Sequence, residues 1–223
     1  MTEITEHLRD IVERVACSAR LAPHATKVTI VAVSKQKTSA EIAEAFRAGQ
    51  RDFGESYAQE AVPKIDALRT FDITWHFIGA LQANKTRLVA EKFHWVHTVD
   101  RAKIAARLND QRPHFAPPLN VLIQVNQAHE AQKSGAAEQD VLPLAHAILA
   151  LPRLRLRGLM TIPPAGADPE PWFRELAALQ SRLRGEGLVL DTLSMGMSSD
   201  FEKAIAAGSN CVRIGTAIFG PRA

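Results

Sequence analysis

Two lysines follow an apolar segment near the start of the chain. Residues 28–33 are apolar and mostly β-branched, and Lys35 and Lys37 come shortly after them. If the segment is a strand, Lys35 shares a face with Val31 and Val33, so it points either into the protein or into a solvated loop. Partial burial and a cationic neighbour favour the neutral amine, which can attack an aldehyde. Lys35 is therefore a candidate for a Schiff base, with a loop lysine as the alternative.

An arginine interrupts the last apolar segment. Arg213 lies between Val212 and Ile214, and an always-charged guanidinium with five donors needs partners if it points inward. One interpretation is an internal ion pair with a carboxylate such as Glu55 or Asp200. The other is a ligand contact. The sequence leaves both open.

Glycines and hydroxyl side chains follow the last two apolar segments. Residues 194–200 read SMGMSSD, and Gly215 and Thr216 follow Arg213 closely. Glycines permit close backbone approach, hydroxyls donate, and a new helix offers unpaired N–H groups, so these stretches predict a phosphate site. An amine, a strand-borne donor and a phosphate cradle together suit a small, flat, phosphorylated aldehyde. Pyridoxal phosphate (PLP) fits this description.

Eight strand-like segments alternate with helical patterns, which is typical of βα units around a parallel sheet. In a chain of 223 residues, this pattern predicts an α/β fold, a single (β/α)8 TIM barrel with its reactive residues at the C-terminal strand ends. We expect one domain, 1–223, with an additional N-terminal helix (1–22) before the barrel (28–220). The predicted strands are 28–34, 52–54, 74–78, 95–99, 120–125, 157–162, 192–195 and 212–214.

Local signals mark the ends of the predicted helices. Thr38 or Ser39 can cap the helix that Gly49 ends, and Ser199 can cap the helix that Gly208 ends. The predicted helices are 39–48, 57–68, 85–92, 101–109, 139–151, 171–184 and 200–207.

Composition limits the classes of protein to consider. The chain is 46% hydrophobic and 23% charged, as in globular proteins. Its net charge of +3 comes from scattered Lys and Arg residues, so no nucleic-acid partner is expected. Cys17 and Cys211 match neither a redox pair nor a zinc motif, and no segment has the pattern of a signal peptide or membrane span. We expect a cytoplasmic monomer without a disulfide, a metal or a membrane contact.

A set of ordered motifs resembles one known family. The motifs are residues 31–35 (VAVSK), 53–57 (FGESY), 75–79 (WHFIG), 81–85 (LQANK), 133–135 (KSG), 158–160 (GLM), 193–198 (LSMGMS) and 212–216 (VRIGT). Together they resemble the bacterial pyridoxal phosphate homeostasis family, over almost the whole of residues 28–220. The resemblance implies the barrel fold of alanine racemase and a role in holding and releasing PLP.

The resemblance also implies roles for individual residues. Lys35 would carry the Schiff base and Arg213 would face the pyridine nitrogen. Because arginine only donates, the ring would be a weaker electron sink than one paired with a carboxylate. Ser198, Gly215 and Thr216 would contact the phosphate.

Other implied contacts have plain structural alternatives. His76 and Met160 would lie beside the ring, although a core histidine and a packing methionine are equally good interpretations. Lys37 and Lys133 would assist cofactor transfer, with solvated surface charges as the alternative. The family commonly has asparagine where this chain has Ser56, so a ring contact there is in doubt and water could replace it.

A racemase is the competing function. Racemisation needs bases on both faces of the substrate, and in similar racemases the second base is a tyrosine from an additional domain. The only tyrosine here is Tyr57, on the rim of the predicted barrel. We therefore expect a non-catalytic PLP carrier, with PLP-dependent apoenzymes as possible recipients. A phosphate-binding barrel without a cofactor is a third possibility.

Overall fold

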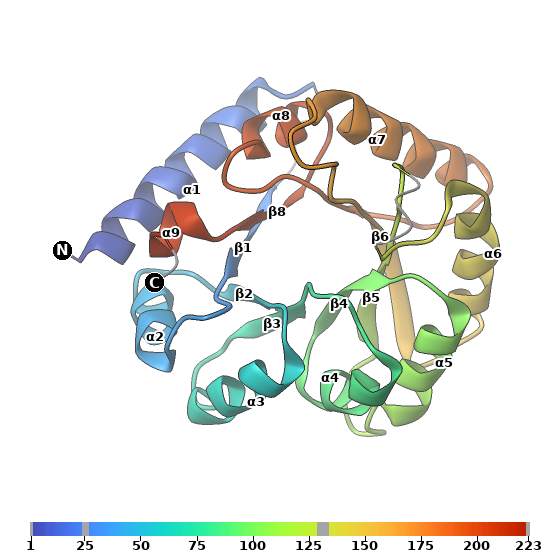
Figure 1. Ribbon diagram of the computed structural model, residues 1–223, viewed down its shortest axis with the longest axis horizontal. Helices are drawn as coiled ribbons and strands as arrows, with labels where there is room; N and C mark the ends of the chain where they lie inside the picture. Colours follow the sequence, from blue (N-terminus) through green and yellow to red (C-terminus); the bar gives the residue numbers. More distant parts are fainter. Residues whose placement is uncertain (1, 24–26, 129–133, 222–223) are drawn as a thin grey trace.

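The strands form a closed parallel barrel. The computed structural model describes residues 2–23, 27–128 and 134–221. Its eight strands pair in chain order, and the last pairs with the first (Figure 1). They are β1 (Thr29–Val33), β2 (Asp52–Glu55), β3 (Thr74–Phe77), β4 (Trp95–Val99), β5 (Leu119–Gln124), β6 (Leu154–Met160), β7 (Thr192–Ser194) and β8 (Cys211–Ile214). The predicted (β/α)8 barrel is confirmed.

Helices surround the strands, as Figure 1 shows. They are α1 (Glu3–Leu21), α2 (Ser39–Arg47), α3 (Ala58–Ala67), α4 (Thr86–Lys92), α5 (Ala102–Gln111), α6 (Glu138–Leu149), α7 (Glu170–Gly185), α8 (Phe201–Ala206) and α9 (Thr216–Phe219), with a short 3₁₀ turn at Ala83–Lys85. Each predicted strand and helix is present, but α9 was not predicted, and β6 begins at Leu154 where position 157 was expected.

The N-terminal helix covers the seam where the barrel closes. Leu8, Ile11 and Val15 are buried, at the i, i+3 and i+7 spacing of one helix face. This face of α1 packs against α8 and α9, which flank β8, and also against α2. The helix predicted before the barrel is therefore part of the same hydrophobic core.

Two helix starts test the predicted caps. Thr38 caps α2, because its side chain accepts a hydrogen bond from the Glu41 N–H. The Glu41 carboxylate in turn accepts from the Thr38 N–H, which completes a capping box. The predicted Ser199 cap is wrong, because α8 begins at Phe201 after Asp200. The Asp200 carboxylate is already held by the backbone N–H of Met197 at 2.6 Å.

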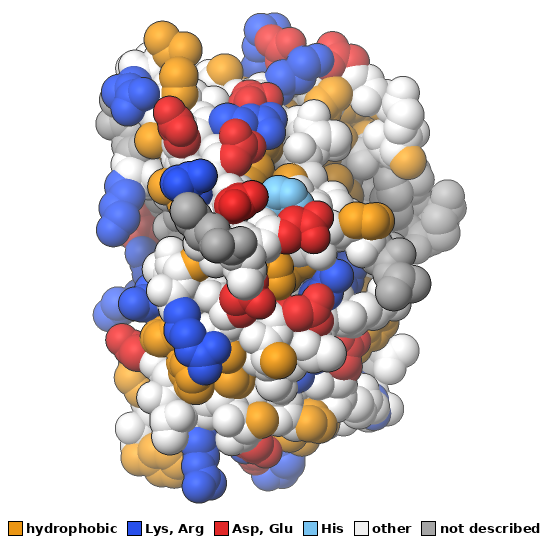
Figure 2. Space-filling view, turned by 90° about the vertical axis from the view of Figure 1, so that its left-hand side faces the viewer, with side chains coloured by type: hydrophobic (Ala, Val, Ile, Leu, Met, Phe, Trp, Pro, Cys, Tyr) orange, Lys and Arg blue, Asp and Glu red, His pale blue; other side chains and the backbone are white. Residues whose placement is uncertain are grey.

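The surface carries both signs of charge. On the face drawn in Figure 2, Lys and Arg side chains are interspersed with Asp and Glu. No helix in the described part of the chain is long and apolar enough to cross a membrane.

Candidate functional site

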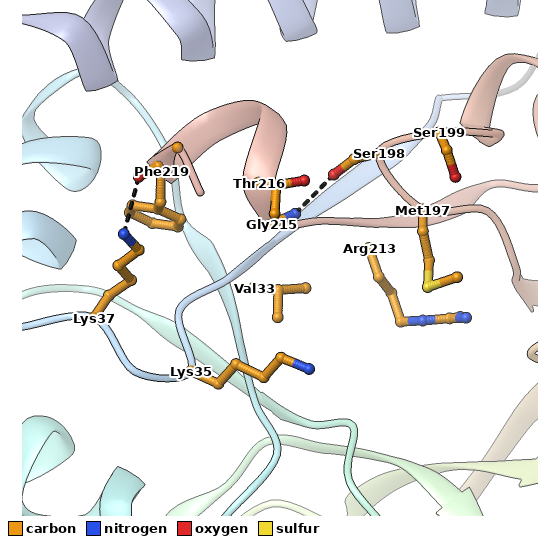
Figure 3. Close-up of a pocket in the computed structure, with 11 residues that line it drawn as sticks. Val33, Lys35, Lys37, Met197, Ser198, Ser199, Arg213, Gly215, Thr216 and Phe219 are labelled. Atoms are coloured by element: carbon orange, nitrogen blue, oxygen red, sulfur yellow. Dashed lines mark hydrogen bonds between the residues drawn. The ribbon is translucent and has the colours of Figure 1, made fainter. Parts of the chain in front are cut away.

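A cavity of about 290 Å³ opens where β1 and β8 end. Its size is near the lower end of the ~300–1,000 Å³ typical of small-molecule sites. It lies at the C-terminal ends of the strands, where barrels of this class carry their reactive residues. The lining residues are Val33, Lys35, Lys37, Met197, Ser198, Ser199, Arg213, Gly215, Thr216, Phe219 and Gly220 (Figure 3). Five of the eight predicted cofactor contacts line this cavity: Lys35, Ser198, Arg213, Gly215 and Thr216.

Lys35 extends into this cavity from the turn after β1. It is half-buried, and in Figure 3 its side chain reaches across the cavity in the direction of Arg213. Gln36, the next residue, has a φ of 62°. Such a left-handed conformation costs a non-glycine residue of order 1–3 kcal/mol and persists only where its surroundings hold it. The turn that carries Lys35 is therefore held under strain.

Three charged residues hold this turn, and we call them the turn clamp: Glu55 and Lys64, which are buried, and Glu60, which is partly exposed. Lys64 Nζ donates to the Ser34 carbonyl at 2.9 Å, to Glu55 Oε1 at 2.9 Å and to Glu60 Oε1 at 2.6 Å, so its three N–H groups are all used. Glu60 Oε1 also accepts from the backbone N–H of Gln36. The clamp thus fixes the residues on both sides of Lys35.

Glu55 completes the turn clamp from β2. Its side chain is fully buried, and Oε1 accepts from the Ser34 hydroxyl at 2.7 Å as well as from Lys64. Oε2 has no hydrogen-bond partner among the described residues. Burial raises the pKa of Glu55 above its ordinary value, although the Lys64 ammonium opposes this.

Arg213 lies at the base of the cavity and is almost completely buried. Nη1 donates to the carbonyl and the hydroxyl of Ser194, both at 2.7 Å, and Nη2 donates to the Thr161 carbonyl at 2.9 Å. No carboxylate of the described residues forms an ion pair with it. The alternative of a pair with Glu55 is wrong, since Glu55 binds Lys64.

The residues after β7 and β8 meet at the opposite wall. The Ser198 hydroxyl oxygen accepts from the backbone N–H groups of Gly215, at 3.2 Å, and Ala217, at 3.4 Å. The Thr216 side chain lines the same wall (Figure 3). A Cβ on Gly215 would lie 3.4 Å from Val33 Cβ, at the limit of ordinary van der Waals contact. Hydroxyls and backbone N–H groups therefore gather here, as an anion site requires.

Lys37 closes the side of the cavity. Its Nζ donates to the Phe219 carbonyl at 3.0 Å and lies 3.4 Å from Glu41 Oε1. The side chain is only 15% exposed, so it is not the solvated surface charge of the alternative interpretation. It connects the turn after β1 to the end of α9. Lys133 lies outside the described residues.

The prediction for His76 needs correction, because the structure does not bring it to this cavity. It lines a second cavity at the N-terminal strand ends and bonds Asp52 and His97. Side chains of one strand alternate in direction, so Ile78, two residues on, takes the position nearer the mouth. A Cβ on Gly54 would lie 3.1 Å from Ile78, which shows that this layer is filled.

Ser56 and Met160 also do not line the cavity. Ser56 is half-buried just after β2, and its backbone carbonyl lies close to Gly79. A Cβ on Gly79 would lie only 2.0 Å from the Ser56 carbonyl oxygen. Met160 is fully buried in β6 and is the register partner of Ser194, which holds Arg213. Their predicted ring contacts stay predictions.

Comparison with known proteins identifies the family. The model of the alanine racemase N-terminal domain family matches residues 7–223. The pyridoxal phosphate homeostasis protein of Escherichia coli is 50% identical over 229 residues, which covers 100% of this chain and 98% of that protein. The chain belongs to the pyridoxal phosphate homeostasis family.

Solved structures place this family among barrels of the same fold. PipY of Synechococcus elongatus, in a structure with PLP bound, is 34% identical with a TM-score of 0.86, covering 97% of this chain and 100% of that one. Alanine racemase of Corynebacterium glutamicum is 16% identical with a TM-score of 0.74, covering 98% of this chain and 61% of that one. The second comparison supports the fold alone.

Sequence reasoning missed the turn clamp of this family member. Lys64 and Glu60 are four residues apart on α3, a spacing typical of an exposed helix pair. Only the barrel shows that Lys64 points beneath the end of β1. Met197 and Phe219, which form apolar walls of the cavity, also follow from the closure of β8 onto β1 and carried no signal of their own.

Buried histidines predict a loss of stability in acid. Burial lowers the pKa of His76 and lowers that of His97 well below 6.5, where the charges of His76 and Arg213 also contribute. Below pH ~6.5 these two histidines bind protons in the unfolded chain but remain neutral in the folded chain. Each histidine therefore lowers the free energy of unfolding by up to about 1.4 kcal/mol per pH unit. Denaturant unfolding should show the free energy falling from pH 7.5 to 5.5.

Two variants separate this effect from other titrations. His97→Gln should flatten the slope with pH, because one group that is neutral when folded is removed. His146→Gln, at an exposed position on α6, should keep the wild-type slope. Equal slopes in His97→Gln and the wild type would contradict the assignment.

Proposed function

We propose that this chain binds PLP in the cavity at the end of β1 and β8 and holds it as a Schiff base on Lys35. Its role would be to store and release PLP within the cell. One observation carries the proposal: Lys35, Arg213 and the wall formed by Ser198, Gly215 and Thr216 line the same cavity. The relatives of this chain are named for PLP homeostasis.

The lining groups fit the chemistry of PLP. The aldehyde needs an amine, and Lys35 supplies it: nitrogen adds to the carbonyl carbon and water leaves. The phosphate needs donors, and the hydroxyls of Ser198 and Thr216 with the N–H groups of Gly215 and Ala217 lie together. The pyridine nitrogen is an acceptor, and Arg213 can only donate. PLP bound in this way supplies a reactive carbonyl that can pass to another amine.

The cavity favours a carrier over a racemase. Tyr57 is 59% exposed and does not line the cavity. Among the described lining residues, Lys37 is the one other amine, and it is bound to the Phe219 carbonyl. A second base on the opposite face of a substrate is therefore not supplied by these residues. We propose a non-catalytic, cytoplasmic monomer whose recipients are PLP-dependent apoenzymes.

Absorbance and transfer test the proposed function. Mixing the protein with PLP should give a near-visible band that borohydride removes, and a PLP-requiring apoenzyme added later should gain activity. The same protein should turn over alanine or serine poorly. Steady racemisation would reject the carrier, and the absence of any new band would reject PLP binding.

The phosphate contact has its own test. Thr216→Ala should weaken PLP retention roughly 10- to 100-fold, as expected for loss of a hydrogen bond to a charged group worth ~1.5–3 kcal/mol. Ser198→Ala should cost less, because it frees the N–H groups of Gly215 and Ala217 that the hydroxyl now occupies. Equilibrium dialysis measures both, with the exposed Thr70→Ala as control. Retention equal to the control in both variants would remove the phosphate assignment.

A further inference from the structure

A chain of polar side chains runs through the barrel from Arg213 to the opposite end. The Ser194 hydroxyl lies 2.7 Å from Arg213 Nη1 and 2.8 Å from His97 Nδ1. His97 Nε2 lies 2.9 Å from His76 Nδ1, and His76 Nε2 lies 2.9 Å from Asp52 Oδ1. We call these five residues the core chain. They come from β8, β7, β4, β3 and β2, so no local sequence feature links them.

The two ends fix the direction of every hydrogen bond in the core chain. Arg213 can only donate and the Asp52 carboxylate can only accept. His76 therefore donates from Nε2 to Asp52, and because the ring is neutral its Nδ1 accepts from His97 Nε2–H. His97 is also neutral, so its Nδ1 accepts from the Ser194 hydroxyl, whose oxygen accepts in turn from Arg213. One tautomer of each imidazole satisfies the whole chain.

Burial keeps the core chain in this state. His97 is fully buried and His76 nearly so, and burial lowers the pKa of both, so each is neutral at pH 7. The His76 ring also stacks on Trp95, with centroids 5.5 Å apart and planes at 12°. Stacking and two hydrogen bonds leave the imidazole a single orientation.

The far end of the core chain opens toward solvent. The Asp52 side chain is 30% exposed and lines a cavity of about 290 Å³ at the N-terminal strand ends. The charged groups around this cavity are Lys27, Asp52, Arg157 and Asp191. Other titratable groups near the core chain are Cys211 beside Ser194, His94 near His76 and Asp52, and Asp200 near Arg213. Asp52 accepts the hydrogen bond from His76, whereas Asp191 is paired with Arg157.

The core chain accounts for how Arg213 is held. Two N–H groups on Nη1 and one on Nη2 are used by Ser194 and Thr161. Nε–H and the second Nη2–H have no hydrogen-bond partner among the described residues. Aligned hydrogen bonds strengthen one another by roughly 10–30% per bond, so the Asp52 charge strengthens the hydrogen bond between Ser194 and the Arg213 guanidinium.

We propose that Asp52, His76, His97 and Ser194 are positioning residues that fix the orientation of Arg213 toward the pyridine nitrogen of bound PLP. The proposal rests on the proposed function. It assigns a role to Asp52, a residue at the end of the barrel opposite the cofactor cavity.

The first test needs no cofactor. Long-range ¹⁵N–¹H spectra of the protein without PLP should show His76 and His97 neutral and protonated on Nε2 at pH 7. A proton on Nδ1 of either ring, or a charged imidazole, would overturn the direction of the core chain and with it the proposal.

The second test compares two carboxylates of the same cavity. Asp52→Asn should shift the absorption maximum of bound PLP and weaken its retention roughly 3- to 10-fold, a typical effect for a substitution along a coupled network. Asp191→Asn changes the charge equally at the same end of the barrel but lies outside the core chain. It should keep the wild-type spectrum and retention.

The outcomes separate the two proposals. If the wild type binds PLP and both variants match it, the positioning role is overturned while the proposed function stands. If the wild type binds no PLP, both are overturned. A thermal melt of Asp52→Asn within a few degrees of the wild type would show that the change in retention is not a loss of folding.

Discussion

Lys35→Ala is expected to abolish the covalent PLP adduct. Lys35 is the lysine whose side chain crosses the cavity in the direction of Arg213, whereas the other amine among the described lining residues, Lys37, is bound to the Phe219 carbonyl. The phosphate donors and Arg213 remain, so weak, non-covalent binding should persist. Borohydride reduction followed by mass spectrometry should change from a stoichiometric adduct in the wild type to none in the variant.

Lys37→Ala is the matched control for this prediction. Lys37 lines the same cavity two residues later, but its ammonium is bound to the Phe219 carbonyl and Glu41. The variant should keep the reducible adduct and bind PLP with altered kinetics at most. An adduct that persists in Lys35→Ala, or that disappears in Lys37→Ala alone, would show that the wrong amine was chosen.

The sequence was sufficient to predict the barrel and the side of it that carries the site. Strands buried on both faces leave apolar runs, so a lysine two residues after Val33 and an arginine inside β8 were visible exceptions. Since the C-terminal ends of all eight strands meet at one end, these exceptions had to lie near each other. Their common cavity follows from this geometry.

The partners of these residues could not be predicted from the sequence. Ser194 and His97 are 97 positions apart, and their hydrogen bond depends on the stagger of the closed barrel. The same stagger decides which layer of inward-facing side chains contains His76. One layer nearer the mouth, His76 could contact the cofactor, whereas in its actual layer it lines the cavity at the N-terminal strand ends. Arg213 likewise donates to two backbone carbonyls and a hydroxyl, whereas its charge alone predicts an ion pair with a carboxylate.

Lys64→Met is expected to destabilise the fold by roughly 3 to 5 kcal/mol, the typical cost of removing one partner from a buried ion pair. Glu55 would lose its ammonium, and the Ser34 carbonyl would lose a donor. Burial already raises the pKa of Glu55, and loss of the Lys64 charge would raise it further. Because a neutral carboxyl tolerates burial, the deficit should shrink as pH falls from 7 toward 5. Denaturant unfolding at several pH values measures this.

Two further variants distinguish the turn clamp from ordinary charge loss. Lys92→Met removes a lysine whose partner, Asp66, is 56% exposed, and should cost less than about 1 kcal/mol, as surface pairs do. Glu55→Gln combined with Lys64→Met removes both buried charges and should recover much of the lost stability at pH 7. Even with its stability recovered, the double variant should form the PLP adduct more slowly than the wild type. The reason is that Gln36 keeps its strained conformation only while Glu60 and Lys64 hold the turn. Adduct formation at the wild-type rate would mean that the turn clamp stabilises the fold without orienting Lys35.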